Sequence, residues 1–254
     1  MRALLDLRLT MESGQPPEFF WNKTGGKYWR DFSHGRCYLW QSGDELFFSG
    51  CDERQVREFL RLEDSLEEIY EVLSGDAVLA EAVQRFRGLR ITKNDPWETL
   101  VAFICSINNN IPRIRRNVQC LLRNGQMPRP EELAGAKLAH AKLGFRERYL
   151  RETASRVSSM DFGRIGRMGY DEAKQELMKL PGVGEKVADC VLLFGFGYLE
   201  AFPVDVWIHR AMRAYYGISG VRKIRQFARE QWHPYEGYAQ QYLYVLVREH
   251  RPQV

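Results

Sequence analysis

The sequence predicts an α+β fold, in which an N-terminal antiparallel β-sheet with flanking helices precedes a mainly α-helical part. Two observations indicate this division. Residues 37–50, CYLWQSGDELFFSG, form two short aromatic-rich runs around a Ser-Gly-Asp turn, which is typical of a β-hairpin. After about residue 90, apolar residues recur three and four positions apart, as in amphipathic helices. We therefore expect two domains, at residues 1–90 and 91–254.

The other N-terminal segments complete the first domain. Residues 4–9, LLDLRL, alternate apolar and polar side chains, which predicts a strand. Residues 13–29 are rich in turn formers. Residues 52–76 and 76–88 carry apolar side chains at helical spacing, so we expect helices beside the sheet.

The second domain is expected to be helical almost throughout. Asp95-Pro96 predicts a helix start, because proline favours the first helical turn. Within 95–107, four apolar residues then fall on one helix face. Further helices are expected at 113–123, 130–139, 146–160, 171–180, 186–196, 206–216, 221–231 and 235–249.

Composition narrows the class of protein. The 254 residues carry a net charge of +4, which permits a nucleic-acid partner without requiring one. No stretch approaches the ~18 apolar residues of a membrane helix, and the N-terminus lacks a signal-peptide core. We expect a cytoplasmic protein with no membrane partner. Nothing resembles a dimerisation zipper, so a monomer is expected.

The cysteines predict reduced thiols. The chain has five, an odd number with wide and irregular spacing, and no C-x-x-C pair occurs. This pattern excludes the usual zinc and iron–sulfur spacings. The five histidines are also scattered, so no metal site built from side chains is expected. The cysteines are Cys37, Cys51, Cys105, Cys120 and Cys190.

Residues 180–190, LPGVGEKVADC, lie between two predicted helices. Gly182, Val183 and Gly184 would form a tight hairpin, in which glycine allows a sharp turn and close approach to a partner. Free N–H groups at the start of the second helix can bind a DNA phosphate without reading sequence. The hairpin carbonyls are a candidate site for a monovalent or structural cation. An ordinary helical hairpin with a solvated Lys186 fits the spacing equally well.

A partner for Lys186 lies further along the chain, in residues 202–210, FPVDVWIHR. Asp205 stands where a helix would begin, where its carboxylate caps free N–H groups and is stabilised by the helix dipole. Taken alone, an aspartate in this place is usually no more than a capping residue.

Together these segments resemble the helix-hairpin-helix DNA glycosylase superfamily, with Lys186 and Asp205 at the matching positions. Within it, the chain resembles the 8-oxoguanine DNA glycosylases. The narrower resemblance rests on four further segments in the family's order, which are the N-terminal LxL…SGQ…FxW pattern, DPWETLVAFICSINNNIPRI, LGFRERY and EGYAQQYLY. The iron–sulfur branch is excluded, because its cysteine cluster is missing. The compact chain favours an archaeal or bacterial member.

The resemblance implies a bifunctional DNA glycosylase and AP lyase acting on duplex DNA that contains 8-oxoguanine, opposite cytosine, in base excision repair. The damaged base is flipped out of the stack. Asp205 stabilises positive charge on the sugar, and Lys186 attacks C1′ to form a Schiff base. β-Elimination then cuts the strand. No organic cofactor is expected.

The resemblance also assigns a base pocket, to which the expected helix 235–249 contributes. The Gly14 carbonyl would accept a hydrogen bond from N7–H, the group that distinguishes the lesion from guanine. Cys190 and Tyr244 would sandwich the base, Gln240 would bond its Watson–Crick edge, and Phe194 would line the pocket. A turn glycine and a core cysteine are the plain structural alternatives.

Other residues would contact the rest of the DNA. By resemblance, Asn108 fills the space left by the flipped base, Arg113 and Arg146 hydrogen-bond the orphaned cytosine, and Phe145 is a wedge beside it. Trp207 stands where the family has a histidine near the flanking phosphate. Phe194, Tyr244 and Phe145 also depart from the expected methionine, phenylalanine and tyrosine. A polar turn and solvated arginines are the structural alternatives.

Three other functions remain open at this stage. A glycosylase for another damaged purine, such as an alkylated one, would normally lack Lys186. A non-catalytic helix-hairpin-helix module would bind DNA without needing the pair of Lys186 and Asp205. A metal-dependent nuclease would need a cluster of carboxylates or histidines that the sequence does not offer.

Overall fold

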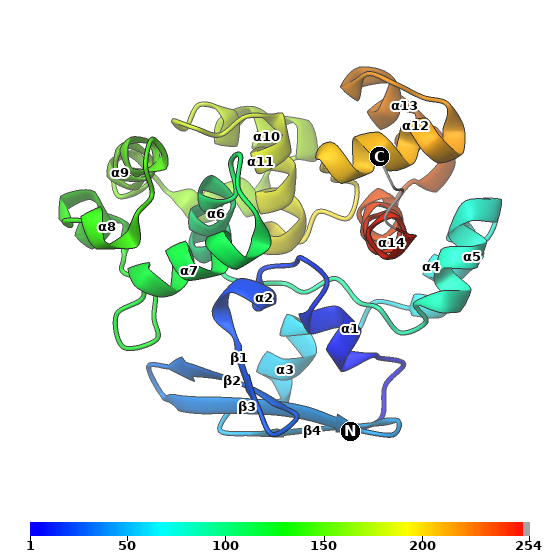
Figure 1. Cartoon of the computed structure of the whole chain (residues 1–254), viewed down its shortest axis with the longest axis horizontal. Coiled ribbons are helices and arrows are strands. Elements are labelled where there is room, and N and C mark those ends of the chain that lie inside the picture. Colours follow the sequence, from blue (N-terminus) through cyan, green and yellow to red (C-terminus); the bar gives the residue numbers. More distant parts are fainter. Residues whose placement is uncertain (251–254) are drawn as a thin grey trace.

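The structure, a computed structural model, describes residues 1–250 and confirms the predicted α+β fold (Figure 1). A four-stranded antiparallel sheet of order β1-β2-β3-β4 lies at the lower edge of the view, with the helices above it. The predicted hairpin at 37–50 is present, and Ser42 pairs with Glu45 across its turn. The strands are β1 (Asn22–Thr24), β2 (Lys27–Phe32), β3 (Gly35–Ser42) and β4 (Glu45–Ser49).

The strand predicted at residues 4–9 is wrong. Only an isolated bridge joins Arg2 to Glu45, and α1 (Leu7–Met11) follows as a short helix. Asp6 explains the difference, because its side chain accepts a hydrogen bond from the backbone N–H of Leu9 at 2.8 Å and caps the helix. The alternating pattern was too short to distinguish a strand from one helical turn.

The helical regions are found as expected, with shorter elements at several places. Proline opens α2 (Pro17–Phe20) inside the turn-rich segment. The expected helix at 52–76 is two helices, because Arg61 has a left-handed φ of 49° and Ser65 caps the second. The remaining helices are α3 (Glu53–Phe59), α4 (Leu66–Leu73), α5 (Ala77–Arg85), α6 (Pro96–Cys105), α7 (Ile111–Leu121), α8 (Pro130–Gly135), α9 (Arg146–Val157), α10 (Tyr170–Met178), α11 (Glu185–Val191), α12 (Val206–Tyr216), α13 (Val221–Trp232) and α14 (Glu236–His250), with short 3-10 turns at Ala139–Ala141 and Phe162–Arg167 and a π-helical turn at Leu192–Phe196.

One hydrophobic core joins the two ends of the chain. It includes side chains from Leu5 to Leu246, and α14 packs against both α5 and α12. The division of the chain near residue 90 therefore stays a prediction. No helix among residues 1–250 is long and apolar enough to cross a bilayer.

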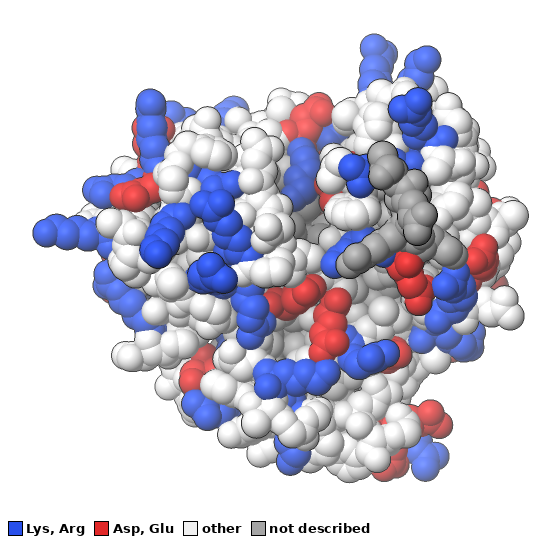
Figure 2. Space-filling model, viewed as in Figure 1, with Lys and Arg blue, Asp and Glu red and all other residues white. Residues whose placement is uncertain are grey.

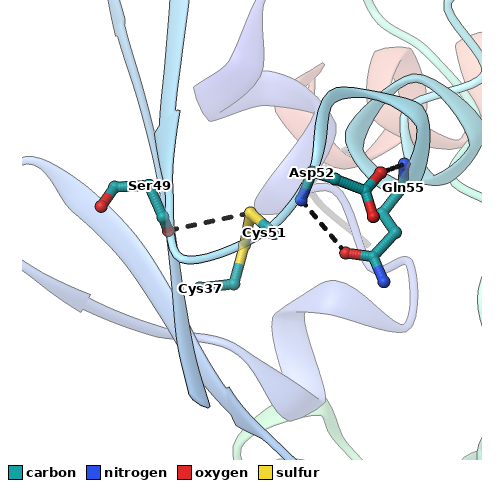
Figure 3. The surroundings of a disulfide bond; sticks show 5 residues. All are labelled: Cys37, Ser49, Cys51, Asp52 and Gln55. Atoms are coloured by element: carbon teal, nitrogen blue, oxygen red, sulfur yellow. Dashed lines mark hydrogen bonds between the residues drawn. A yellow bond between two sulfur atoms is a disulfide. The ribbon is translucent and has the colours of Figure 1, made fainter. Parts of the chain in front are cut away.

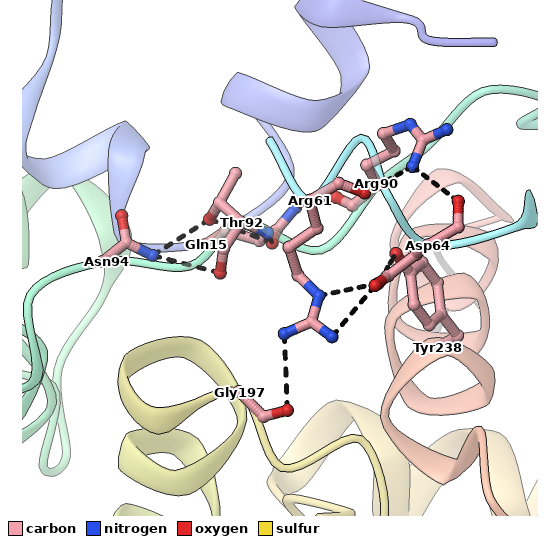
Figure 4. A network of polar contacts seen from close by, with 8 residues as sticks. All are labelled: Gln15, Arg61, Asp64, Arg90, Thr92, Asn94, Gly197 and Tyr238. Atoms are coloured by element: carbon pink, nitrogen blue, oxygen red, sulfur yellow. Dashed lines mark hydrogen bonds and ion pairs between the residues drawn. The ribbon is translucent and has the colours of Figure 1, made fainter. Parts of the chain in front are cut away.

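A polar network reinforces the contact between the early and late helices (Figure 4). Arg61 donates to the Asp64 carboxylate at 2.7 Å and to the Gly197 carbonyl at 3.3 Å. Tyr238, on α14, donates to the same carboxylate at 2.8 Å. One carboxylate thus joins the segment between α3 and α4 to the C-terminal helix.

A second, buried network positions α11. Asp189 is 0% exposed and accepts hydrogen bonds from Lys174 on α10 at 3.1 Å and from Arg225 on α13 at 2.6 Å. The Tyr170 hydroxyl donates to it at 2.6 Å. Burial of a carboxylate is tolerated only with such partners, so the network fixes α11 against two neighbouring helices.

A disulfide corrects the expectation of reduced thiols. Cys37 and Cys51 are bonded, with their Cα atoms 5.2 Å apart, beside the start of α3 (Figure 3). Tyr38 pairs with Ser49 in the sheet, so the end of β4 brings Cys51 back to Cys37. Sequence spacing could not reveal this, because the pairing depends on strand register. Three cysteines are free, of which Cys120 is exposed and Cys105 and Cys190 are buried.

Replacing Cys37 and Cys51 together by serine should lower the free energy of unfolding by about 3 kcal/mol, because the bond closes a loop of about 15 residues in the unfolded chain. Denaturant unfolding without reductant measures this change. Cys120→Ser, at an exposed free cysteine, is the matched control and should alter stability little. Detection of five reactive thiols in unreduced, denatured protein would contradict the bond, which predicts three.

Replacing Asp189 by alanine should destabilise the protein by about 3–5 kcal/mol, because Lys174 would keep a buried charge without its partner. Thermal and denaturant unfolding would measure the loss. Asp171→Ala, in the exposed first turn of α10, is the control and should change stability by less than about 0.5 kcal/mol. Equal effects of the two substitutions would show that the network does not stabilise the fold.

Candidate active site

A cavity of about 670 Å³ lies between the hairpin before α11, the loop between α6 and α7, and helix α14. Its walls come from both ends of the chain as well as from its middle. Eleven of the predicted site residues line it, namely Gly14, Asn108, Gly182, Gly184, Lys186, Cys190, Phe194, Asp205, Trp207, Gln240 and Tyr244. The fold therefore brings most of the predicted site together.

Lys186, the second residue of α11, points at the end of α6. Its Nζ donates to Ser106 Oγ at 3.1 Å and lies 4.9 Å from the centre of the Phe103 ring. Ser106 Oγ donates its own proton to the Phe103 carbonyl at 2.7 Å, which leaves its lone pairs for the amine. Lys186 is thus half-buried and oriented rather than freely solvated.

Asp205 caps α12, as the sequence predicts. Its Oδ1 accepts hydrogen bonds from the backbone N–H groups of Trp207 and Ile208, each at 2.9 Å. No hydrogen bond to Oδ2 is found within residues 1–250, so this oxygen is available to the cavity. Asp205 can therefore cap α12 and also take part in the site, because Oδ1 caps the helix while Oδ2 faces no partner among the described residues.

Cys190 lies within the electrostatic reach of both residues. Burial raises the pKa of its thiol to about 12, while the charge of Lys186 lowers it and that of Asp205 raises it further. The thiol is therefore neutral at physiological pH and contributes shape rather than charge. Lys186 bonds Ser106 and Asp205 caps α12, and no ion pair between Lys186 and Asp205 is found in the part of the chain that the structure describes.

The hairpin before α11 has a geometry that can bind a DNA phosphate through main-chain N–H groups. Gly182 has a φ of +76°, and a Cβ there would lie 2.7 Å from Cγ of Tyr149, so only glycine fits. Val183 is buried and does not line the cavity, since its side chain anchors the hairpin and its N–H donates to the Leu180 carbonyl at 3.1 Å. Gly184 precedes α11, which has no side-chain cap among the described residues, so N–H groups of its first turn are free for a phosphate.

The asparagine-rich loop is held in a defined shape. Asn108 has a left-handed φ of 46° and lines the cavity. Arg146 lies behind the loop, where Nε donates to the Ile107 carbonyl at 2.6 Å and Nη2 to the Asn108 carbonyl at 2.7 Å. Because Arg146 is only 3% exposed, the structure places it as a support of the loop rather than as a free donor in the cavity. Burial also lowers the pKa of Arg146, and the nearby positive charge of Arg113 lowers it further.

Two other predicted DNA contacts lie on the rim, outside the cavity lining. Phe145 is 53% exposed, and its ring lies 4.6 Å from the Arg146 guanidinium carbon. Arg113 is exposed in the first turn of α7. Figure 2 shows Lys and Arg side chains gathered over α7, α8 and α9, in the left half of the view. Exposed basic residues of this region include Arg113, Arg116, Lys142, Arg148 and Arg151.

The opposite wall has the features of a pocket for a planar, polar group. Phe194 stacks on Phe103 with ring centres 5.8 Å apart. Gln240 Oε1 is buried and finds no hydrogen-bond partner within the described chain, so an acceptor is left for a ligand. Burial raises the pKa of Tyr244 to about 12, against the charge of Arg248, so the phenol stays protonated. Gly14 lies against Tyr244, since a Cβ on it would be 2.7 Å from the hydroxyl.

Sequence reasoning missed several residues that complete the cavity. Ser106 and Phe103 orient Lys186, and Arg248 donates to the Tyr244 hydroxyl at 3.2 Å. The signal for the first two was present, because they end the same apolar helix that leads into the asparagine run. Arg248 could be found only once α14 was seen to reach the N-terminal turn. No group of three or more His, Cys, Asp or Glu side chains suited to a metal occurs in residues 1–250.

Comparison with known proteins gives the same picture. Residues 2–100 match the family described as 8-oxoguanine DNA glycosylase, N-terminal domain, and residues 173–194 match the helix-hairpin-helix motif. The chain is 33% identical over 225 residues to a probable N-glycosylase/DNA lyase of Methanothermobacter thermautotrophicus, and the matched region covers 74% of this chain and 72% of the relative. A yeast N-glycosylase/DNA lyase, from Saccharomyces cerevisiae, is 33% identical over 193 residues, but the chain spans about half (51%) of its length.

A solved structure extends the similarity to the whole fold. The 8-oxoguanine glycosylase/lyase of Clostridium acetobutylicum, bound to double-stranded DNA with cytosine opposite 8-oxoguanine, superposes with a TM-score of 0.88 at 29% identity, covering 97% of this chain and 93% of that chain. The resemblance predicted from the sequence is confirmed, and the chain belongs to the 8-oxoguanine DNA glycosylase family of the helix-hairpin-helix superfamily.

Proposed function

We propose that this protein is a bifunctional DNA glycosylase and AP lyase that excises 8-oxoguanine opposite cytosine from double-stranded DNA. The observation that carries the proposal is that Lys186 and Asp205 line the same cavity. The charges of both residues also influence the pKa of the buried Cys190 thiol, which lines this cavity too. A cavity of about 670 Å³ has room for a base flipped out of the duplex.

In this proposal the base enters with its polar edge toward α14. The unpaired Gln240 Oε1 accepts from the N–H donors of the purine's Watson–Crick edge, which removes the cost of an unsatisfied buried acceptor. The Gly14 carbonyl accepts from N7–H, which guanine lacks. Cys190 and the ring of Tyr244 supply apolar contacts to the base faces.

The chemistry needs a stabilised cation and a nucleophile. As the bond between C1′ and the base breaks, its electron pair leaves with the base, and the negative Asp205 stabilises the positive charge left on the sugar. The nitrogen lone pair of Lys186 bonds to C1′, and the C1′–O4′ bond then breaks as an amine proton passes to O4′, which leaves a Schiff base between Lys186 and the opened sugar. The imine acidifies C2′, and loss of that proton expels the 3′ phosphate by β-elimination. The hydrogen bond from Nζ to Ser106 holds the amine within the cavity before DNA binds.

The remaining DNA contacts follow from the rim. The free N–H groups at the start of α11 would bind a phosphate, Phe145 would wedge into the stack, and Arg113 would reach the orphaned cytosine. A monovalent cation would be held by the carbonyls of Gly182 and Val183, to which no hydrogen bond is found within residues 1–250. We propose a monomer that acts on chromosomal DNA in the cytoplasm.

Borohydride should trap wild-type protein covalently on a duplex with one 8-oxoguanine opposite cytosine, because reduction fixes the Schiff base. Lys186→Gln should give no trapped complex and should slow strand cleavage more than about 100-fold, since the nucleophile is lost. Lys179→Gln, at an exposed lysine just before the hairpin, is the matched control and should trap normally.

Three other results would contradict parts of this proposal. Trapping by Lys186→Gln would assign the nucleophile elsewhere. Base release by wild type without trapping or strand cleavage would indicate a glycosylase that uses water. Binding without release would leave only a DNA-binding module.

Arg113→Ala should reduce the preference for cytosine opposite the lesion about 10- to 100-fold, because one arginine contact to a base edge contributes about 1–3 kcal/mol of discrimination. Single-turnover excision with each of the four opposite bases measures the preference. Arg116→Ala, at an exposed arginine on the same helix, should weaken binding equally for all four duplexes. An unchanged preference in Arg113→Ala would remove this residue from opposite-base recognition.

A further inference from the structure

The turn that carries Gly14 is fixed on both sides by amide side chains. The Ser13 carbonyl accepts from Gln241 Nε2 of α14 at 2.9 Å. The Gln15 side chain bonds the backbone at Arg90 and Thr92, each at 2.9 Å. Hydrogen bonds thus hold both neighbours of Gly14, while no hydrogen bond to the Gly14 carbonyl is found in the described part of the chain.

Glu18 holds the central residue of this turn. Its Oε2 accepts a hydrogen bond from the Gly14 N–H at 2.7 Å. A bond between an N–H group and a carboxylate is about twice as strong as one between neutral groups. On its other side Gly14 lies against the Tyr244 hydroxyl, so it is confined between a charge and an aromatic side chain.

The Glu18 side chain is not needed to hold its own helix. Arg115 of α7 donates to the Glu18 backbone carbonyl, and Gln119 donates to the Phe19 carbonyl at 2.8 Å. These bonds attach α2 to α7 through the backbone. The carboxylate is therefore spare for Gly14, and its removal leaves the attachment of α2 intact.

The charge of Glu18 is compensated from two directions. Burial raises its pKa, while the Gly14 N–H and the charges of Arg248 and Arg115 act in the opposite sense. A half-buried carboxylate is costly unless it is bonded, and here the bond is to the turn that lines the cavity.

We infer that Glu18 is a positioning residue for lesion recognition, which fixes the Gly14 peptide so that its carbonyl meets the N7–H of the flipped base. The inference rests on the proposed function and adds a residue to it. Glu18 thus contributes through the position of the Gly14 peptide, and its charge strengthens the bond that holds this peptide.

The test compares two reactions of the same full-length protein. Excision of 8-oxoguanine needs the base to be recognised, whereas cleavage of a duplex with a preformed abasic site needs only the sugar. Glu18→Ala should slow single-turnover excision about 10- to 100-fold relative to abasic-site cleavage. Glu18→Gln, whose amide oxygen can still accept from Gly14 but carries no charge, should give a ratio between those of wild type and Glu18→Ala.

Glu12→Ala is the matched control, because this exposed carboxylate precedes the same turn and bonds Lys23 and Tyr28 instead. It should leave the ratio of the two rates unchanged. A parallel fall of both rates in Glu18→Ala, or an unchanged ratio, would overturn the inference. Wild-type protein that cleaves abasic sites but releases no 8-oxoguanine would instead overturn the proposed substrate, and the inference with it.

Discussion

The arrangement of the site depends on the ion pairs that the buried carboxylate of Asp189 makes with two neighbouring helices. Asp189 lies in the middle of α11 and receives Lys174 from one neighbouring helix and Arg225 from another. Arg225 continues to Glu185 at the start of the same helix, at 2.6 Å. These bonds oppose rotation and sliding of the helix, and so they help to set the direction of Lys186 on its first turn. The energetic cost of burying these charges is offset by their mutual bonds, so the network specifies orientation more than it adds stability.

The cavity is equally dependent on contacts between distant parts of the sequence. Its walls include residues of α14, the turn around Gly14, and α11, which carries Lys186. Gln241 and Tyr238 of α14 bond the N-terminal turn and the segment after α3, respectively. A cavity made in this way exists only in the complete fold, since neither the sheet region nor the helical region contains all of its walls.

Much of this could be predicted from the sequence, and the failures have physical reasons. The hairpin at 180–184, the capping Asp205 and the helical spacing are local signals, and the structure has each of them. The strand expected near the N-terminus was wrong, because Asp6 caps a helical turn there. The disulfide depends on strand register, which residue spacing does not encode.

The same distinction applies within the site. Lys186, Gly14 and Gln240 belong to recognisable motifs, so resemblance located them. Ser106 bonds Lys186 across the fold, at a separation of 80 residues. Glu18 bonds Gly14 only four residues away, but this bond depends on the conformation of the turn between them, which no motif indicates. Arg146 had the expected position but a different environment, since burial engages its guanidinium with the loop backbone. Motif recognition gives identity, whereas the state of a side chain depends on its neighbours in space.

The glycine at 182 has a mechanical consequence. Its Cα rests on Tyr149, whose ring contacts Phe145 edge-on at 6.1 Å between centres, and the Thr153 hydroxyl donates to the Pro181 carbonyl at 2.8 Å. The part that would bind the DNA backbone and the part that would enter the base stack are therefore connected by direct contacts through α9. With the spacing between them set by the protein, any adjustment on binding falls on the duplex. Such a protein would discriminate between DNA sites by their deformability, because a weakly stacked or easily bent base step would engage both parts at a lower deformation energy than a stiff step.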